Sequence, residues 1–282
     1  MKKNTDHIRI YCPGGVVSAA ALREITVTGF YLGSPYLQLG LRQDIVFPLA
    51  DKEAQNRLRQ ENCLAQIPKN FKGDDQPNIV SSLPAAEIFP STDWIAPGVY
   101  HEILNLFDFR PKLKVNLIDP KQDLICHFTG DINFLASTVP NYWYLYWRRP
   151  GQDPLNRWPS LISGNKIADV VKNLETILNA QPNCAAEEVF NYVQENIKSG
   201  AFPPKFWPEI RGAPVPVYEG FYEREGKYWF GLYQKENKYS CDLLENLCLL
   251  CQRTNITTVA ITSWGSLLFK NIAPTEISKW RD

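Results

Sequence analysis

Hydrophobic residues recur along this chain at spacings typical of strands and helices, and one arrangement of them occurs twice. Residues 8–49 and residues 230–271 align without a gap at a constant offset of 222. Ser18 meets Ser240, and because serine is a preferred N-cap, a helix is expected to begin after each. Apolar residues coincide at the strand positions: Ile8 with Phe230, Leu39 with Ile261, and Phe47 with Phe269. Each copy therefore predicts strand, turn, helix, strand and strand, and we expect the two copies to pack together.

The region between the two copies has a different pattern. Polar stretches that contain prolines, at 68–78 and 202–217, are typical of linkers. Between them, the spacing of apolar residues predicts three helices and three strands. The helices are expected at 98–108, 165–179 and 185–200, the last with Gly200 as its C-cap, and the strands at 110–119, 129–137 and 141–150.

These elements predict an α+β fold in which two pseudo-symmetric β-α-β half-domains flank a mixed α/β domain. We expect the first half-domain at 1–70, the central domain at 71–201, and a linker with the second half-domain at 202–282. The alternative explanation of the repeat is coincidence, because β-α-β segments in general share apolar spacing.

The stretch LQLGLRQDIVFPL, residues 37–49, reads as a buried strand with a charge at its centre. A buried unpaired charge is costly, so Arg42 is expected to reach water, a partner or a ligand. One interpretation is a strand end whose guanidinium extends to water. The second copy has Trp264 at the equivalent position, a difference that packing alone does not require, and this favours a functional role for Arg42.

A second group of cations lies at the start of the predicted strand 110–119. Side chains two residues apart point to the same face of a strand, so Arg110, Lys112 and Lys114 are expected to line one face. Like charges at that spacing repel each other. Either the face is simply solvated, or an anion such as a carboxylate, a phosphate or another oxyanion relieves the repulsion.

Composition and charge exclude some classes of function. The chain has 282 residues with 30 basic and 30 acidic side chains, whereas a protein held to nucleic acid by phosphate attraction normally has a basic excess. The N-terminus lacks the apolar core of a signal peptide, and no apolar run has the length of a membrane span. Seven scattered cysteines, an odd number, indicate reduced thiols. We therefore expect a cytoplasmic protein with no nucleic-acid or membrane partner.

Motifs for metal or cofactor chemistry are sparse. Cys248 and Cys251 have C-x-x-C spacing but lie in an apolar helical segment, where thiols of the core are expected rather than redox or metal ligands. The three histidines form no metal-ligand spacing. The Gly14-Gly15 pair is typical of a turn into the following helix rather than of a dinucleotide fingerprint. No metal site is predicted.

Three stretches, in this order along the chain, resemble the siroheme-dependent nitrite and sulfite reductases. PGGVVSAAALREI followed by LQLGLRQDIVFPL resembles the first ferredoxin-like half-domain of those enzymes, and ITSWGSLLFKNI resembles the second. RPKLKVNL with DINFLAS resembles the domain between them, where a Lys-x-Lys strand precedes an Asp-x-Asn-Phe segment. The order and the spacing agree over most of residues 8–272, so the resemblance and the internal repeat imply the same fold.

In that family, the arginine of the Arg-Gln pair and the two strand lysines belong to a basic cluster. The cluster holds the anionic substrate over the siroheme iron and faces the carboxylates of the porphyrin. The resemblance therefore implies that Arg42, Lys112 and Lys114, with Arg110 beside the lysines, bind an anion or a tetrapyrrole. Siroheme is the cofactor that it implies, and the catalytic residues are left unassigned.

The sequence also departs from the family pattern. Asn78 stands where the family has a second arginine, and neither the C-x5-C nor the C-x3-C spacing of the iron–sulfur ligands occurs. The bulky segment YWYLYWRRP replaces the glycine-rich stretch that lets a tetrapyrrole lie against the backbone, and Trp143 and Trp147 are candidates to fill that space. Tyr11-Cys12-Pro13 and PNIVSSLPAAEIF resemble a subset from nitrate-assimilating bacteria in which a rubredoxin domain follows, although these 282 residues contain no rubredoxin cysteine pairs.

Three functions remain open. The first is an accessory or electron-transfer protein of nitrite or sulfite assimilation that is not catalytic alone and acts with a redox partner protein or a reductase subunit. The second is a reductase-type module that binds siroheme and needs a second chain for the iron–sulfur cluster. The third is a structural interaction module in which the aromatic strand 142–147 packs against a partner. Nitrite, sulfite and phosphate are the candidate small anions.

Overall fold

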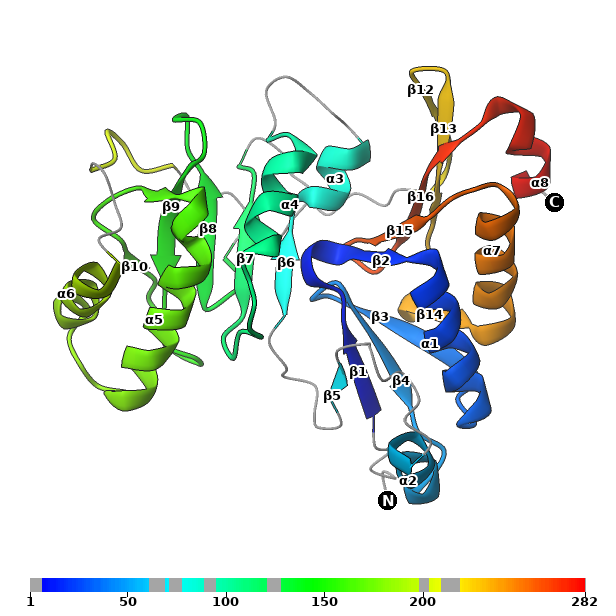
Figure 1. Cartoon of the computed structure of the whole chain (residues 1–282), viewed down its shortest axis with the longest axis horizontal. Coiled ribbons are helices and arrows are strands. Elements are labelled where there is room, and N and C mark those ends of the chain that lie inside the picture. The colour runs from blue at the N-terminus through cyan, green and yellow to red at the C-terminus, as the bar shows by residue number, and fades with distance from the viewer. Residues whose placement is uncertain are drawn as a thin grey trace. The chain divides into compact units, whose positions relative to one another are not determined.

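A computed structural model of the chain describes residues 7–60, 69–70, 78–88, 95–120, 128–197, 203–208 and 219–281. The predicted C-cap Gly200 and most of the predicted linkers, residues 71–77 and 209–217, lie outside these ranges. The chain divides into two compact units: unit 1 combines residues 1–76 with 216–282, and unit 2 comprises residues 77–215 (Figure 1). Among the described residues, no helix is long and apolar enough to cross a membrane.

Unit 1 contains both copies of the repeat. The first copy consists of β1 (His7–Tyr11), a 3₁₀ turn (Pro13–Gly15), β2 (Val16–Ser18), α1 (Ala19–Tyr31), β3 (Tyr36–Gly40) and β4 (Asp44–Pro48). The second consists of β13 (Lys227–Leu232), a 3₁₀ turn (Lys235–Asn237), β14 (Lys238–Ser240), α7 (Cys241–Arg253), β15 (Thr258–Ile261) and β16 (Leu267–Ile272). Both turns, both short strands and both helices coincide at the offset of 222, so the predicted repeat is confirmed. Unit 1 also contains α2 (Lys52–Gln60), β5 (Lys69–Asn70), β12 (Gly220–Arg224) and α8 (Ile277–Arg281).

The two copies complete each other's sheets. One sheet has the order β14-β3-β4-β1-β5 and the other β2-β15-β16-β13-β12, so the short strand before each helix pairs with the opposite copy. The registers are equivalent, because Ser18 lies opposite Thr258 and Ser240 lies opposite Tyr36. The two halves are therefore related by a pseudo-twofold axis. The exchanged strands pair through equivalent residues in the two copies.

Helices α1 and α7 pack side by side in unit 1 (Figure 1). Ser18 and Ser240 cap them as predicted, since each hydroxyl accepts a hydrogen bond from an amide in the first turn. Arg23 of α1 donates to Glu245 of α7 at 3.2 Å, and these two positions are equivalent in the repeat. Buried side chains from both copies form a single hydrophobic core.

A close contact between the 3₁₀ turn and the following hairpin recurs in both copies with its residues exchanged. In the first copy, a Cβ at Gly15 would lie 2.7 Å from the side chain of Gln43. In the second copy the equivalent residues are Asn237 and Gly265, and a Cβ at Gly265 would lie 2.3 Å from the Asn237 side chain. Each contact therefore has room for one side chain only, and either partner can supply the glycine.

This exchange predicts a non-additive pair of substitutions. We expect Gly265→Gln to lower the free energy of unfolding by about 2 kcal/mol or more, because the new side chain overlaps Asn237 and φ at this position is +84°. The double variant Asn237→Gly with Gly265→Gln copies the first half of the molecule and should recover most of that loss. Urea unfolding of both single variants and the double variant measures the coupling. Additive effects of the two substitutions would contradict the steric explanation.

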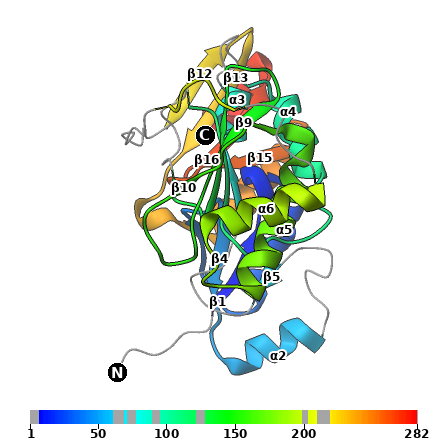
Figure 2. The same ribbon diagram turned by 90° about the vertical axis from the view of Figure 1, so that its left-hand side faces the viewer.

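Unit 2 is built on one mixed sheet with the order β10-β9-β8-β7-β6, and β11 also pairs with β9. The strands are β6 (Ile79–Ser81), β7 (Val115–Ile118), β8 (Ile132–Ala136), β9 (Tyr142–Trp147), β10 (Asn156–Arg157) and β11 (Ile162–Ser163). The helices are α3 (Leu83–Ile88), α4 (Pro97–Asn105), α5 (Ile167–Ala180) and α6 (Ala186–Ile197). Strands β6, β7 and β8 are parallel, and β9 is antiparallel to β8. Figure 2 views this sheet nearly edge-on, with α4, α5 and α6 on one side of it.

The predicted α+β fold class is confirmed by these elements. The helices expected at 98–108, 165–179 and 185–200 correspond to α4, α5 and α6, and the last two expected strands correspond to β8 and β9. The strand expected at 110–119 is wrong over its first half, because only Val115–Ile118 forms a strand. That half contains the three cations, and its conformation decides how they are presented.

Candidate anion-binding site

Arg42 lies in the turn that joins β3 to β4. Residues 37–49 are therefore two strands, as the repeat predicts, and the interpretation of this stretch as one buried strand is wrong. The amide of Gln43 donates to the carbonyl oxygen of Gly40 at 3.0 Å, and the φ of Gln43 is +55°. Apolar residues on both sides made this hairpin resemble one continuous strand, although Gly40 stands at the first position of its turn. The side chain of Arg42 is half-buried at the tip of the hairpin.

The charge that this stretch does bury belongs to Asp44. Asp44 is fully buried, and Arg9 on the neighbouring strand β1 is 9% exposed and donates to its carboxylate. A buried carboxylate requires such a partner, because removing the partner leaves an uncompensated charge. The buried charge of this stretch is therefore the carboxylate of Asp44 and not the guanidinium of Arg42. Arg9, also in unit 1, compensates it.

Residues 110–114, here named the basic loop, precede β7 in unit 2. The amides of Lys112 and Leu113 donate to the carboxylate of Glu175 in α5, at 2.5 and 2.9 Å. The amide of Lys114 donates to the carboxylate of Asp131 at 2.9 Å. Each backbone residue has one N–H to donate, so amides bonded to these carboxylates are not available to a neighbouring strand. The basic loop is for this reason not the strand that the sequence predicts.

Burial nevertheless alternates along the basic loop. Pro111 and Leu113 are buried, whereas Arg110 and Lys112 are exposed and Lys114 is half-buried. The two apolar side chains pack inward, and the cations therefore point outward. This alternation does not depend on hydrogen bonds to a neighbouring strand, because β7 begins only at Val115. Three cations within five residues therefore reach the outer side of one loop.

The turn before β8 holds the basic loop from its other end. The amides of Asp131 and Ile132 both donate to the carbonyl oxygen of Lys114, at 2.8 and 3.0 Å. Together with the bond from the Lys114 amide to the Asp131 carboxylate, these contacts fix both polar backbone groups of Lys114. The position from which the Lys114 side chain departs is therefore well determined.

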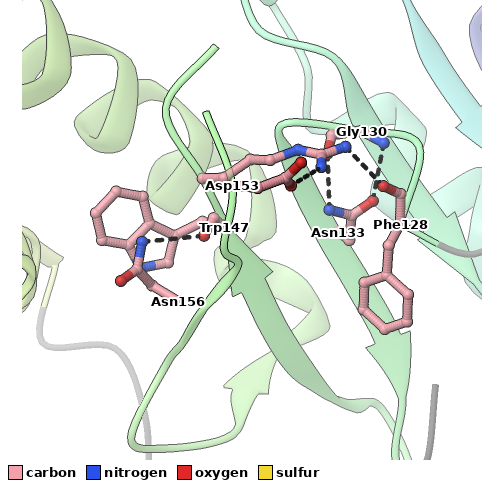
Figure 3. Close-up of polar contacts among 7 residues, drawn as sticks. Phe128, Gly130, Asn133, Trp147, Asp153 and Asn156 are labelled. Atoms are coloured by element: carbon pink, nitrogen blue, oxygen red, sulfur yellow. Dashed lines mark hydrogen bonds and ion pairs between the residues drawn. The ribbon is translucent and has the colours of Figure 1, made fainter. Parts of the chain in front are cut away.

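The turn is itself braced by polar contacts (Figure 3). Arg148 donates to the carbonyl oxygen of Phe128 and to the carboxylate of Asp153, each at 2.8 Å. Asn133 bonds the backbone of Gly130 in both directions, at 2.9 and 3.0 Å. Residues 128–131 therefore form a rigid support for Lys114 rather than a free connection.

Glu175 is the carboxylate with the most perturbed environment at this site. Burial raises its pKa above the ordinary value for glutamate, while the amides of Leu113 and Lys112 and the charge of Lys112 lower it by less. Burial disfavours the charged form of a carboxyl group, and hydrogen bonds to the carboxylate favour it. The ammonium of Lys112 and the carboxylate of Glu175 interact, so Glu175 offsets part of the positive charge of the basic loop.

The aromatic strand β9 is part of the core of unit 2. Trp143 and Trp147 are fully buried, at 0% and 1% exposure. Tyr144 and Tyr146 belong to a second hydrophobic cluster, and both rings contact Trp207, with centroids 5.7 and 5.2 Å apart. The two tryptophans therefore contribute packing to unit 2, and their predicted role of filling a tetrapyrrole pocket is not needed to explain their size.

The thiols of the C-x-x-C pair lie in the core of unit 1, as expected. Cys248 and Cys251 are 2% and 0% exposed, and burial raises the pKa of each to about 12. Both are therefore protonated near neutral pH, whereas a metal ligand or a nucleophile requires the thiolate. Within the described residues, no group of three or more histidine, cysteine or acidic side chains could hold a metal ion.

The structure brings three of the four predicted site residues together. Arg110, Lys112 and Lys114 share the basic loop of unit 2, whereas Arg42 belongs to unit 1, so the grouping of Arg42 with the lysines stays a prediction. Sequence reasoning missed Glu175, which lies 62 residues beyond Leu113 and is only one polar position of an amphipathic helix. Local patterns carry no signal for such a long-range bond.

Comparison with known proteins supports the fold. No family model matches the chain, and no curated protein matches it. Solved structures do resemble it, among them the NirA protein of Mycobacterium tuberculosis, with a TM-score of 0.68 and 16% sequence identity. The match covers 97% of this chain and 55% of NirA, so the chain spans about half the length of that protein. At this identity the likeness is a distant relationship of fold.

The role of Glu175 as the anchor of the basic loop can be tested by matched substitutions. We expect Glu175→Ala to lower the free energy of unfolding by about 1–3 kcal/mol, because the amides of Lys112 and Leu113 lose their acceptor. Glu175→Gln retains a carbonyl oxygen in the same place and should lose much less. Chemical denaturation of both variants makes the comparison, and equal losses would argue against the hydrogen bonds.

The raised pKa of Glu175 also predicts a pH dependence. A carboxyl group whose pKa is higher in the folded state binds more protons when folded, so its contribution to stability falls as the pH rises through the interval between the unfolded and folded values. That interval begins near the ordinary value of about 4.3 and extends upward. The stability of the unmodified protein relative to Glu175→Gln should therefore decline as the pH rises through that interval. A difference that grew with pH would show that the amides outweigh burial.

Proposed function

We propose that the chain is an accessory module of nitrite or sulfite assimilation that binds a small oxyanion and does not catalyse the reduction alone. The observation that supports this is the basic loop, whose three cations project outward from a backbone anchored by Glu175 and Asp131. The resemblance of three stretches to the siroheme-dependent nitrite and sulfite reductases supports the metabolic context, and the relationship of fold to the NirA protein is consistent with it. The chain spans only 55% of NirA, so the activity of the whole protein is not carried over.

The chemistry of the basic loop suits an oxyanion. Guanidinium and ammonium groups form charge-assisted hydrogen bonds with anionic oxygens, which are stronger than neutral ones. Arg110, Lys112 and Lys114 contribute three positive charges, and Glu175 and Asp131 contribute two negative ones that are already bonded to backbone amides. The remaining positive charge favours a small anion, and the grouping of Arg42 with this loop stays a prediction that Arg42→Ala tests.

Siroheme is the cofactor that the resemblance implies, and the described residues fit only part of it. The cations of the basic loop would hold the carboxylates at its rim. To hold its iron as well, the chain would have to supply a ligand such as a thiolate or an imidazole. Four described cysteines lie in the core of unit 1 with exposures of 3% or less: Cys12, Cys241, Cys248 and Cys251. No step of the proposed function runs through siroheme.

Anion titration tests the proposal directly. Sulfite, nitrite and phosphate should each raise the melting temperature if the site is specific, because a ligand of the folded state stabilises it. The variants Lys112→Ala, Lys114→Ala and Arg42→Ala should each weaken binding by about tenfold or more, since each removes a charge-assisted contact worth roughly 1.5–3 kcal/mol. The matched control is Lys227→Ala, which removes one exposed cation outside the site and should leave the affinity unchanged.

Two other results would redirect the assignment. A stoichiometric tetrapyrrole spectrum after titration with siroheme, abolished by Lys112→Ala, would favour the siroheme-binding module. Failure of all three anions and of siroheme to bind would overturn the proposal and leave the cations to solvent or to a protein partner. Equal weakening by Lys227→Ala would show that bulk charge, and not the basic loop, attracts the anion.

A further inference from the structure

One face of helix α1 in unit 1 exposes large apolar side chains. Val27, Phe30 and Tyr31 are 43%, 63% and 53% exposed, so three of the large apolar residues that stay exposed in the described part of the chain lie on one helix. Residues three and four apart share one face of a helix, so Arg23 and Glu24 lie on the same face before Val27, and both are exposed. The face therefore has a polar half, which contains Arg23 and Glu24, and an aromatic half, which contains Phe30 and Tyr31.

The repeat shows that the fold does not require aromatic residues at these positions. The counterparts of Phe30 and Tyr31 in α7 are Gln252 and Arg253, and both are exposed. A cation in the last turn of a helix interacts favourably with the helix dipole, and α1 has no basic residue there. The stability of α1 alone therefore does not explain its aromatic half.

A cavity of about 860 Å³ adjoins the polar half of the face. Ala20, Arg23 and Glu24 line it from α1, and Glu245 and Cys248 line it from α7. Because the three residues of α1 are exposed, the cavity opens on the same face as the aromatic side chains. One helix thus carries projecting rings and a hollow next to each other, and such a surface can fit a second copy of itself.

A two-fold axis at Val27 would bring the two halves together. In an antiparallel pair of α1 helices related by that axis, residues three and four positions after Val27 in one copy face residues three and four positions before it in the other. Phe30 and Tyr31 of one copy then lie against Arg23 and Glu24 of the second copy. A guanidinium over an aromatic ring is favourable, and a tyrosine hydroxyl can donate a hydrogen bond to a carboxylate.

The charges of the two halves are also complementary. Arg23 donates to Glu245 at 3.2 Å, so these two compensate each other, and Glu24 is the further charge of the polar half. Beside the aromatic half, the guanidinium of Arg57 in α2 lies 5.7 Å from the centre of the Tyr31 ring. Antiparallel packing brings Glu24 of each copy toward Arg57 of the other, and opposite charges favour this arrangement.

We propose that this face of α1 is the interface of a two-fold dimer of the chain. The interface belongs to unit 1 and does not rest on the proposed function. The competing explanation is that Tyr31 only packs on Arg57 within one copy, and that Phe30 is one of the single apolar residues that occur on any protein surface. The oligomeric state in solution separates the two explanations.

Sedimentation equilibrium of the whole chain is the first experiment. One helix face is at the small end of interface sizes, so we expect a reversible dimer with a dissociation constant in the micromolar range. The double variant Phe30→Gln with Tyr31→Arg copies α7 and should weaken the dimer about hundredfold or more, because a two-fold interface loses each contact twice. Its urea midpoint should stay close to that of the unmodified protein, since the second half of the fold contains the same residues. The matched control Leu41→Gln removes a leucine that is 68% exposed outside this face and should leave the dimer unchanged.

Cysteine cross-linking tests the position of the axis. The Val27 side chains of the two copies meet at the axis, so Val27→Cys should form a disulfide between copies under mild oxidation. In Ala20→Cys, which keeps the apolar contacts, the two thiols are separated by about 21 Å along the helices and should not react beyond the level of the unmodified protein. A monomer at every concentration, a double variant that dimerises like the unmodified protein, equal weakening by Leu41→Gln, or equal cross-linking of the two cysteine variants would overturn the proposal.

Discussion

Neither half of unit 1 can complete a sheet from its own residues, and most of the structure depends on this constraint. Strand β2 lies at the edge of the sheet formed by the second copy, and β14 lies at the edge of the sheet formed by the first. An unpaired edge exposes a row of amide and carbonyl groups, so each copy needs the other to cover it. Because a shift of one residue would turn every side chain to the opposite face, both exchanges must also keep their register. The offset of 222 is therefore preserved most strictly from the turn before the short strand to the end of the helix.

Comparing equivalent positions of the two copies helps to distinguish residues that stabilise the fold from residues that are candidates for a function. Gln43 and Asp44 both differ from their counterparts, Gly265 and Ser266, yet packing explains both differences. Gln43 occupies the space that Asn237 fills in the other copy, and Asp44 is paired with Arg9, whose counterpart is a glycine. A difference between the copies is thus not in itself a sign of function. The exchange of Arg42 for Trp264 remains after both are explained, so Arg42 stays a candidate for anion binding.

The periodicity of apolar residues predicts which side chains of the basic loop are buried. It does not predict with which acceptors the backbone amides form hydrogen bonds. The alternation of Pro111 and Leu113 with the cations was interpreted as a strand, and the burial that it predicts is present. Whether an amide joins a ladder depends on the nearest acceptor, and here that acceptor is Glu175, 62 residues away from Leu113. The interpretation of residues 37–49 as one strand is wrong for a related reason, and only the repeat predicts two strands there. A non-glycine residue at positive φ, Gln43, closes the turn, and Gly40 at its first position is the one local signal of it.

Strand β7 shows how one short element can support two different surfaces. Its residues Val115–Ile118 are all buried, so the strand offers no side chain to a ligand along its length. Polar chemistry is therefore possible only beyond its ends, where the backbone leaves the sheet. At the amino end, the carboxylates of Glu175 and Asp131 accept hydrogen bonds from the amides of the basic loop, and the three cations of the loop point outward. At the carboxyl end, Asp119 follows the last buried residue of the strand, and its carboxylate accepts a hydrogen bond from the amide of Ile95. The four buried residues of the strand therefore separate these two polar ends.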